Sequence, residues 1–150
     1  MSLQKVRDII GELPDAADFV GGVSEGEIAA AEQALGLTFP GEYREFLREY
    51  GCGNFGYIEI FGLGVARTGL PNVEWVTGKL RANAQFPSHL LPVEQLGDGA
   101  YACVTTVQSE AKGYQTGIVV EWSHSVQVAK IAADFASYLS ERFEAVRAAR

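Results

Sequence analysis

Few residues of this chain have the types and spacing that catalysis requires. An enzyme needs a base, a nucleophile or a metal ion held together in a cleft. The 150 residues include two histidines, His89 and His124, and two cysteines, Cys52 and Cys103, and none of them stands in a metal-binding or nucleophile motif. Both histidines fall near expected turns or loops, where we expect structural roles. The sequence therefore predicts no catalytic residue, no metal site and no cofactor.

Acidic side chains offer a different chemistry, the attraction of a cationic partner. The chain carries 19 Asp and Glu against 12 Lys and Arg, a net charge of −7, and residues 1–50 hold ten acids and four bases, a net −6. Phosphate binding needs a basic footprint, so this distribution argues against nucleic acid as a direct ligand. It permits a basic protein partner, although solubility alone would also explain a surplus of acid.

Three of these acids recur at helical spacing. Glu42, Glu45 and Glu49 are expected on one face of a helix, opposite its apolar side chains. Together with Trp75, a residue type enriched at the centres of interfaces, they are the candidate partner-binding residues. Two alternatives stay open: an ordinary solvated helix face for the acids, and packing in the core for Trp75.

Two consecutive helices within residues 24–53 must position these acids. Ser24 and Glu27 have the spacing of a capping box at the start of the first helix, and Gly36 is placed to end it in a left-handed conformation. Pro40 suits the first position of the second helix. The apolar stripe of that second helix comprises Tyr43, Phe46, Leu47 and Tyr50.

The remaining pattern predicts an α+β fold in a single domain, residues 1–150. N-terminal helices and a C-terminal helix would pack on a mainly antiparallel sheet. Asp98-Gly99 is a hairpin signal between two of the strands. The expected elements are a helix over 3–12, a loop over 18–23, strands over 57–61, 93–96, 101–107, 117–122 and 125–130, and a helix from about 133; residues 70–85 are ambiguous because Gly78 weakens a helical pattern there.

The order of these features resembles the SUKH superfamily, the Smi-one/Knr-four-like proteins. Members typically carry Leu-Pro-x-x-Tyr-x-x-Phe-Leu and then a glycine turn, and here Phe39 replaces the leucine. Later segments follow the family order up to about residue 140, but Val104-Thr105-Thr106 stands where many members carry an Asp. The structural motif that the resemblance assigns comprises Glu32, Leu35, Pro40, Tyr43, Phe46, Leu47 and Gly53, with Glu32 expected to bond backbone amides near the glycine turn.

The resemblance implies a protein-binding module and not an enzyme. Bacterial members are associated with immunity against polymorphic toxins, many of them nucleases or deaminases, which they bind and block. The expected partner is therefore a cognate toxin domain, and a basic one would suit the acidic segment. The alternative is a regulatory interaction domain of the same fold, like the fungal regulator of cell-wall synthesis, and an enzyme of unknown type is the least favoured hypothesis. The oligomeric state stays open.

The sequence also predicts a compartment. No apolar run approaches the roughly 20 residues of a membrane helix, and residues 1–10 lack the apolar core of a secretory signal. Two cysteines without a disulfide framework suggest free thiols in a reducing environment. We therefore expect a cytoplasmic protein with no membrane partner.

Overall fold

Two antiparallel sheets and five α-helices make up the described part of the chain. The computed structural model describes residues 3–83, 85–124 and 126–150. The helices are α1 (Gln4–Glu12), α2 (Glu25–Leu35), α3 (Gly41–Glu49), α4 (Val73–Asn83) and α5 (Phe135–Ala148), with 3-10 turns η1 (Pro14–Ala16) and η2 (Val107–Lys112). The strands are β1 (Ala17–Phe19), β2 (Gly53–Phe55), β3 (Ile58–Ile60), β4 (Leu90–Gly97), β5 (Ala100–Thr105), β6 (Val119–Ser123) and β7 (Val126–Ala132).

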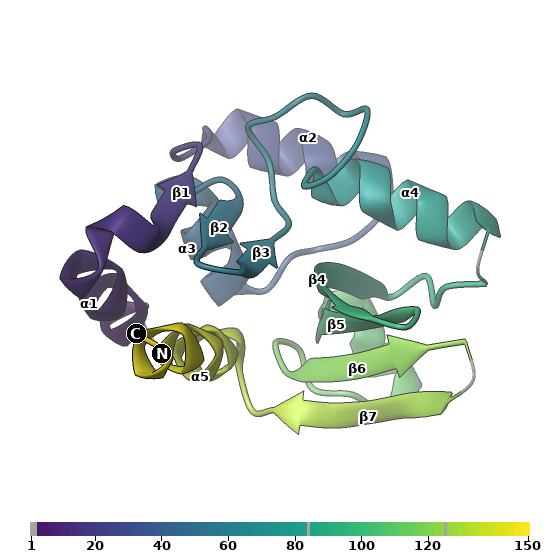
Figure 1. The fold of residues 1–150 in the computed structure, drawn as a ribbon. Coiled ribbons are helices and arrows are strands. Elements are labelled where there is room, and N and C mark those ends of the chain that lie inside the picture. The colour runs from purple at the N-terminus through teal and green to yellow at the C-terminus, as the bar shows by residue number, and fades with distance from the viewer. Residues whose placement is uncertain (1–2, 84, 125) are drawn as a thin grey trace.

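The sheets and helices form the α+β arrangement that the sequence predicts. One sheet has the order β1-β2-β3 and the other the order β4-β5-β6-β7. The two are joined where the Phe61 amide, just after β3, donates to the Val93 carbonyl of β4 at 2.8 Å. Figure 1 shows α1 lying beside α5, so the two ends of the chain meet on one side of the molecule.

The expected capping box opens α2. The Ser24 hydroxyl accepts from the Glu27 amide at 3.2 Å, the Glu27 carboxylate accepts from the Ser24 amide, and Gly36 ends the helix with φ of 69°. The next helix, α3, begins one residue later than predicted. Pro40 is its N-cap and not its first residue, because its backbone is extended (ψ 154°) while its carbonyl already accepts the first helical bond, from Arg44.

Residues 17–19 form a strand, whereas the sequence predicted a loop over 18–23. Three residues carry too little periodicity to identify a strand, and β1 exists because it pairs with β2. Gly53 makes that pairing close: its φ is 146°, and a Cβ there would lie 2.2 Å from the Asp18 carbonyl oxygen. The requirement for glycine at this motif position is therefore steric.

The ambiguous segment contains a helix, α4. The Asn72 side chain accepts from the Trp75 amide at 2.9 Å, and this cap supports the helix despite Gly78. Strand β4 begins at Leu90, three residues before the predicted start, and η2 was not predicted. Both cysteines are free and buried, and burial raises the pKa of Cys52 to about 11. Within the described ranges, no helix is long and apolar enough to cross a membrane.

The main core is built on the predicted apolar stripe of α3. Tyr43, Phe46 and Leu47 are fully buried. The Phe46 ring lies 5.8 Å from that of Phe135 on α5, and the Tyr43 hydroxyl donates to the Phe61 carbonyl at 2.8 Å. The stripe therefore ties α3 both to the C-terminal helix and to the junction of the two sheets.

Glu32 bonds a backbone amide, as expected, but in the turn before α3 and not at the glycine turn after it. Its carboxylate accepts from the Phe39 backbone amide at 2.7 Å and from the Arg44 guanidinium at 2.5 Å. The side chain is mostly buried, with 17% of it exposed. Glu32 therefore fastens the end of α2 to the turn that leads into α3.

Replacing Glu32 should weaken this junction in a graded way. We expect Glu32→Ala to lower the free energy of unfolding by about 1–3 kcal/mol, because it leaves the Phe39 amide without its acceptor. Glu32→Gln keeps an acceptor oxygen and should cost less. Chemical denaturation of both variants checks this. Equal losses would mean that the amide bond is not what stabilises the turn.

Candidate functional site

An acidic cleft lies where the N-terminal ends of α3 and α5 meet. Its volume is about 390 Å³. Side chains of α3 and α5 form two of its walls, and the loop between η2 and β6 forms the third. The lining residues are Pro40, Gly41, Glu42, Glu45, Thr116, Gly117, Ala133, Asp134 and Phe135. Two of the predicted partner-binding residues, Glu42 and Glu45, therefore lie together in one cleft.

Glu42 is the least satisfied polar group in this cleft. One carboxylate oxygen, Oε1, accepts from the Ala136 amide in the first turn of α5 at 3.1 Å. The other, Oε2, is buried and has no hydrogen-bond partner among the described residues. Burial raises the pKa of Glu42, the Ala136 amide opposes that shift, and the negative charge of Asp134 adds to it. The carboxylate is therefore partly withdrawn from water beside a second negative charge, without an ion pair among the described residues.

Asp134 is the acidic residue of the cleft that the sequence analysis missed. Its side chain caps α5 by accepting from the Ser137 amide at 2.7 Å. The available signal was its position before an apolar helical pattern, where Asp is a favoured N-cap. Because Asp134 and Glu42 both serve the first turn of α5, the N-terminus of that helix brings two carboxylates into the same cleft.

The predicted acidic stripe is not a free, solvated face. Arg7 of α1 forms ion pairs with both Glu45 and Glu49, and its Nε lies 2.8 Å from Glu49 Oε2. These bonds lower the pKa of Glu49. Glu49 also lies outside the lining of the cleft. Helical spacing could not reveal Arg7, because it reaches the stripe from a different helix.

Charge is distributed unevenly around α3. On one flank, Arg44 and Arg48 pair with Glu25 and Glu32, so two bases meet two acids. On the cleft side, the single base Arg7 serves both Glu45 and Glu49, while Glu42 and Asp134 bond only backbone amides. The lining of the cleft itself holds three carboxylates, Glu42, Glu45 and Asp134, and Arg7 pairs with Glu45 from outside the lining. Two acids of the N-terminal third, Glu42 and Glu45, therefore meet Asp134 of the C-terminal segment in the cleft.

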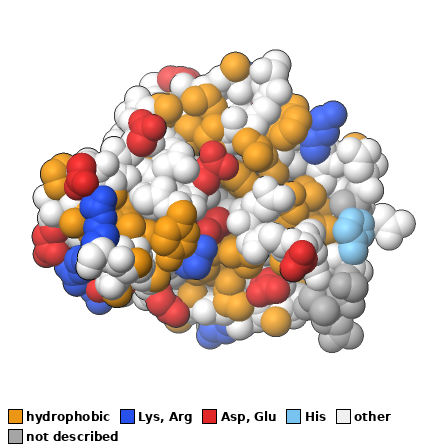
Figure 2. Space-filling view, viewed as in Figure 1, with side chains coloured by type: hydrophobic (Ala, Val, Ile, Leu, Met, Phe, Trp, Pro, Cys, Tyr) orange, Lys and Arg blue, Asp and Glu red, His pale blue; other side chains and the backbone are white. Residues whose placement is uncertain are grey.

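Trp75 belongs to a different surface. It lies on α4, partly buried against the core, and the Lys79 ammonium is 5.7 Å from the centroid of its ring. With Leu70, Leu80 and Tyr101 it lines a mainly apolar groove of about 360 Å³. In Figure 2, apolar side chains gather over this region of α4 and the larger sheet. The structure therefore does not bring Trp75 together with the acidic residues of the cleft.

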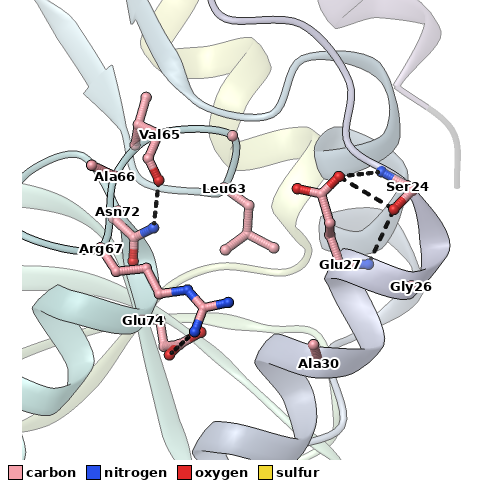
Figure 3. Close-up of a pocket in the computed structure, with 11 residues that line it drawn as sticks. Ser24, Gly26, Glu27, Ala30, Leu63, Val65, Ala66, Arg67, Asn72 and Glu74 are labelled. Carbon is pink, nitrogen blue, oxygen red and sulfur yellow. Dashed lines mark hydrogen bonds and ion pairs between the residues drawn. The ribbon is translucent and has the colours of Figure 1, made fainter.

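A larger pocket, of about 500 Å³, lies between the start of α2 and the segment 63–67. Figure 3 shows that its polar side chains bond one another: Glu27 folds back onto Ser24, and Arg67 reaches Glu74 at 3.6 Å. The Asn72 amide is likewise used, donating to the Val65 carbonyl at 3.2 Å. These polar groups hold the walls of the pocket together instead of converging on its centre.

One Ser–His hydrogen bond joins the residue types of a catalytic pair, but it is buried. His89 Nδ1 lies 2.7 Å from the Ser109 hydroxyl oxygen. Ser109 is fully buried, so a substrate has no access to that oxygen. Among the described residues, no group of three or more His, Cys, Asp or Glu side chains is placed to hold a metal ion.

Known proteins resemble this chain in sequence and in fold. Residues 6–144 match the SUKH family described as SMI1-KNR4 cell-wall. No curated protein matches the chain. Among solved structures, that of a protein from Pseudomonas syringae pv. tomato superposes with a TM-score of 0.63 at 20% identity, covering 83% of this chain and 89% of that one. That likeness shows the fold, and the family match spans nearly all of the described elements. The chain belongs to the SMI1-KNR4 cell-wall family of the SUKH superfamily.

Proposed function

We propose that this chain is a non-enzymatic protein-binding module that acts as an immunity protein, binding and blocking a basic toxin domain. The family supports the general class, since bacterial SUKH proteins are associated with toxin immunity. The observation that carries the proposal is the acidic cleft, with three carboxylates in its lining and the buried, unpartnered Oε2 of Glu42. A toxin nuclease must attract phosphate, so its active site is basic and complementary to such a cleft.

The cleft suits a lysine or arginine side chain of the partner. A partly buried carboxylate with one unpartnered oxygen is unfavourable on its own, and a cation brought by the partner would satisfy it. Asp134 and Glu45 flank Glu42, so an incoming cation would meet acidic groups from both helices. The free protein would thus carry an unfavourable interaction that binding relieves.

The raised pKa of Glu42 should affect how the stability of the folded protein depends on pH. Because its pKa is raised above the ordinary value of 4.5, the folded state binds a proton more readily than the unfolded chain. The stability that this provides is present below the unfolded pKa and is lost as pH rises through the folded pKa. We therefore expect Glu42→Gln to gain stability relative to the natural protein as pH rises from below 4.5 towards neutrality. Thermal unfolding across that range is the measurement, and a constant difference would contradict the assignment.

If a toxin domain is encoded beside this gene, co-expression with it tests the function itself. We expect a stable complex on co-purification and restored growth of cells that produce the toxin. A toxin from an unrelated pair serves as the control and should be neither bound nor blocked. If the neighbouring toxin stays active in the presence of excess folded chain, with no complex formed, the immunity proposal is wrong.

The second candidate is a regulatory interaction domain, favoured by the cell-wall description of the matched family. That function predicts a resident cellular protein as the partner in place of a toxin. Purifying the chain from cells with and without the toxin gene distinguishes the two functions. A regulatory domain would be captured with its partner in both kinds of cell.

A further inference from the structure

The groove beside Trp75, between α4 and the strands β4 and β5, differs in charge from the other pockets described above. Its described lining contains one charged residue, Lys79, and no Asp or Glu. The acidic cleft and the larger pocket each contain at least two carboxylates. In a chain with a net charge of −7, a groove whose one charge is positive favours a partner of the opposite charge.

The charge of Lys79 is not neutralised within the chain. Its ammonium lies 5.7 Å from the centroid of the Trp75 ring, and no ion pair among the described residues includes it. The one acid of α4, Glu74, pairs with Arg67 instead. Arg81, two residues beyond Lys79, likewise has no carboxylate partner in the described ranges. The C-terminal half of α4 therefore presents two positive charges that no described acid neutralises.

The neutral polar side chains of the groove are also unused. None of them forms a hydrogen bond with another described residue; they are the indole of Trp75, the hydroxyl of Tyr101 and the amides of Asn83 and Gln95. The larger pocket is different, because its polar side chains bond one another across its walls. An indole and an ammonium can only donate hydrogen bonds, so this groove favours a ligand with acceptors, such as a carboxylate.

The groove also has the length and the apolar surface to hold a peptide segment. Its α4 wall runs from Trp75 to Asn83, which is about 12 Å of helix. Leu70, which is 49% exposed, and the partly buried Leu80 add apolar surface beside the Trp75 ring. A large apolar side chain placed there would remove this surface from water, and tryptophan is enriched at the centres of interfaces.

We propose that this groove docks a segment of a protein partner in which a large apolar residue stands next to an Asp or Glu. The apolar side chain packs beside Trp75 and Leu80, and the carboxylate pairs with Lys79. The groove shares no described lining residue with the acidic cleft. The proposal therefore goes beyond the toxin-binding function and does not rest on it.

Selection from a library of random short peptides displayed on phage tests this, with the folded full chain as bait. Peptides that bind Lys79→Glu, which keeps the acidic cleft, are discarded first, and the remainder are selected on the natural chain. We expect the recovered peptides to place Leu, Ile, Met or Phe next to Asp or Glu. Synthetic copies should bind Trp75→Ala about tenfold more weakly or worse. In NMR spectra of the natural chain they should shift the signals of Trp75, Gln95 and Tyr101.

The matched control is Lys5→Glu, which reverses another lysine without a described ion pair, on α1 at the opposite side of the molecule from α4 (Figure 1). It should bind the peptides as the natural chain does. Recovery of no peptide, or of peptides without acids, would overturn the proposal. Shifts confined to residues outside the groove would do the same, and they remain measurable if Trp75→Ala does not fold. Failure of toxin binding would leave the result untouched.

Two other occupants would also overturn the proposal, and each has its own measurement. Sedimentation velocity of the chain alone would reveal a dimer, and a dimer that Lys79→Glu dissociates would show that a second copy covers the groove. Decanoate is a small apolar carboxylate without a peptide backbone. If decanoate shifted the signals of Trp75 and Tyr101 while no displayed peptide did, the groove would be a site for small carboxylic acids.

Discussion

Replacing Phe46 with alanine is expected to lower the free energy of unfolding by about 3–5 kcal/mol. Phe46 is fully buried, and its ring lies within contact range of Phe19, Tyr50 and Phe135, at centroid distances of 6.1, 5.7 and 5.8 Å. Removing it leaves a cavity between α3, β1 and α5 that rigid aromatic neighbours cannot fill. Since domains are stable by only about 5–15 kcal/mol, this one change should remove a large part of the total.

Denaturant unfolding monitored by circular dichroism measures this loss. Tyr57→Ala is a suitable control, because Tyr57 is also aromatic but is 66% exposed, and its removal should change stability by no more than about 0.5 kcal/mol. Comparable losses in the two variants would show that the aromatic cluster around α3 is not the main core. Because Phe135 also lines the acidic cleft, we expect the cleft of the Phe46 variant to disappear in the same unfolding transition as the core.

The parts of the fold that could be predicted are those specified by local interactions. The Ser24–Glu27 capping box and the end of α2 at Gly36 depend on residues a few positions apart, and both are present. The Asp98-Gly99 hairpin is equally local, with φ of 52° and 78° at its two turn residues. Such signals can be recognised because the backbone geometry and the residue that permits it are adjacent in sequence.

The parts that were missed depend on distant segments. Strand β1 has three residues and forms only against β2, which lies more than thirty residues further along the chain. Pro40 supports the predicted helix but stands one place outside it, a difference that residue preferences alone do not resolve. The turn η2 is held by hydrogen bonds from the Thr106 and Ser109 hydroxyls to the His89 carbonyl. The sequence of η2 itself does not predict these bonds, because His89 lies on a distant segment.

The same distinction applies to the candidate site. Spacing along one helix identified Glu42 and Glu45, but not Asp134, Thr116 or Gly117, which reach the cleft from two other segments. It left open whether the acids form an ordinary solvated face, whereas Arg7 binds two of the three predicted ones. Side-chain type and helical period indicate which residues share a face, and tertiary packing decides what that face meets.

Neutralising the acidic cleft is expected to slow association with a basic toxin domain about tenfold or more at low ionic strength. The suitable variant combines Glu42→Gln, Glu45→Gln and Asp134→Asn. Gln keeps an acceptor for the Ala136 amide and Asn is an equally good N-cap, so the start of α5 should survive. Reversing Glu45 and Glu49 to lysine would instead repel Arg7 and disturb the packing of α1, so neutral substitutions isolate the electrostatic effect.

A second triple variant controls for net charge. It removes an equal number of negative charges outside the cleft, by Glu59→Gln, Glu121→Gln and Glu141→Gln. In the described ranges none of these three carboxylates has an ion-pair partner. Association rates measured by stopped flow at low and high salt should differ between the two variants at low salt and converge at high salt, because screening removes steering. Equal slowing of both would mean that the whole acidic surface attracts the toxin. An unchanged rate in both would remove the cleft as the docking site while leaving immunity to act through another face.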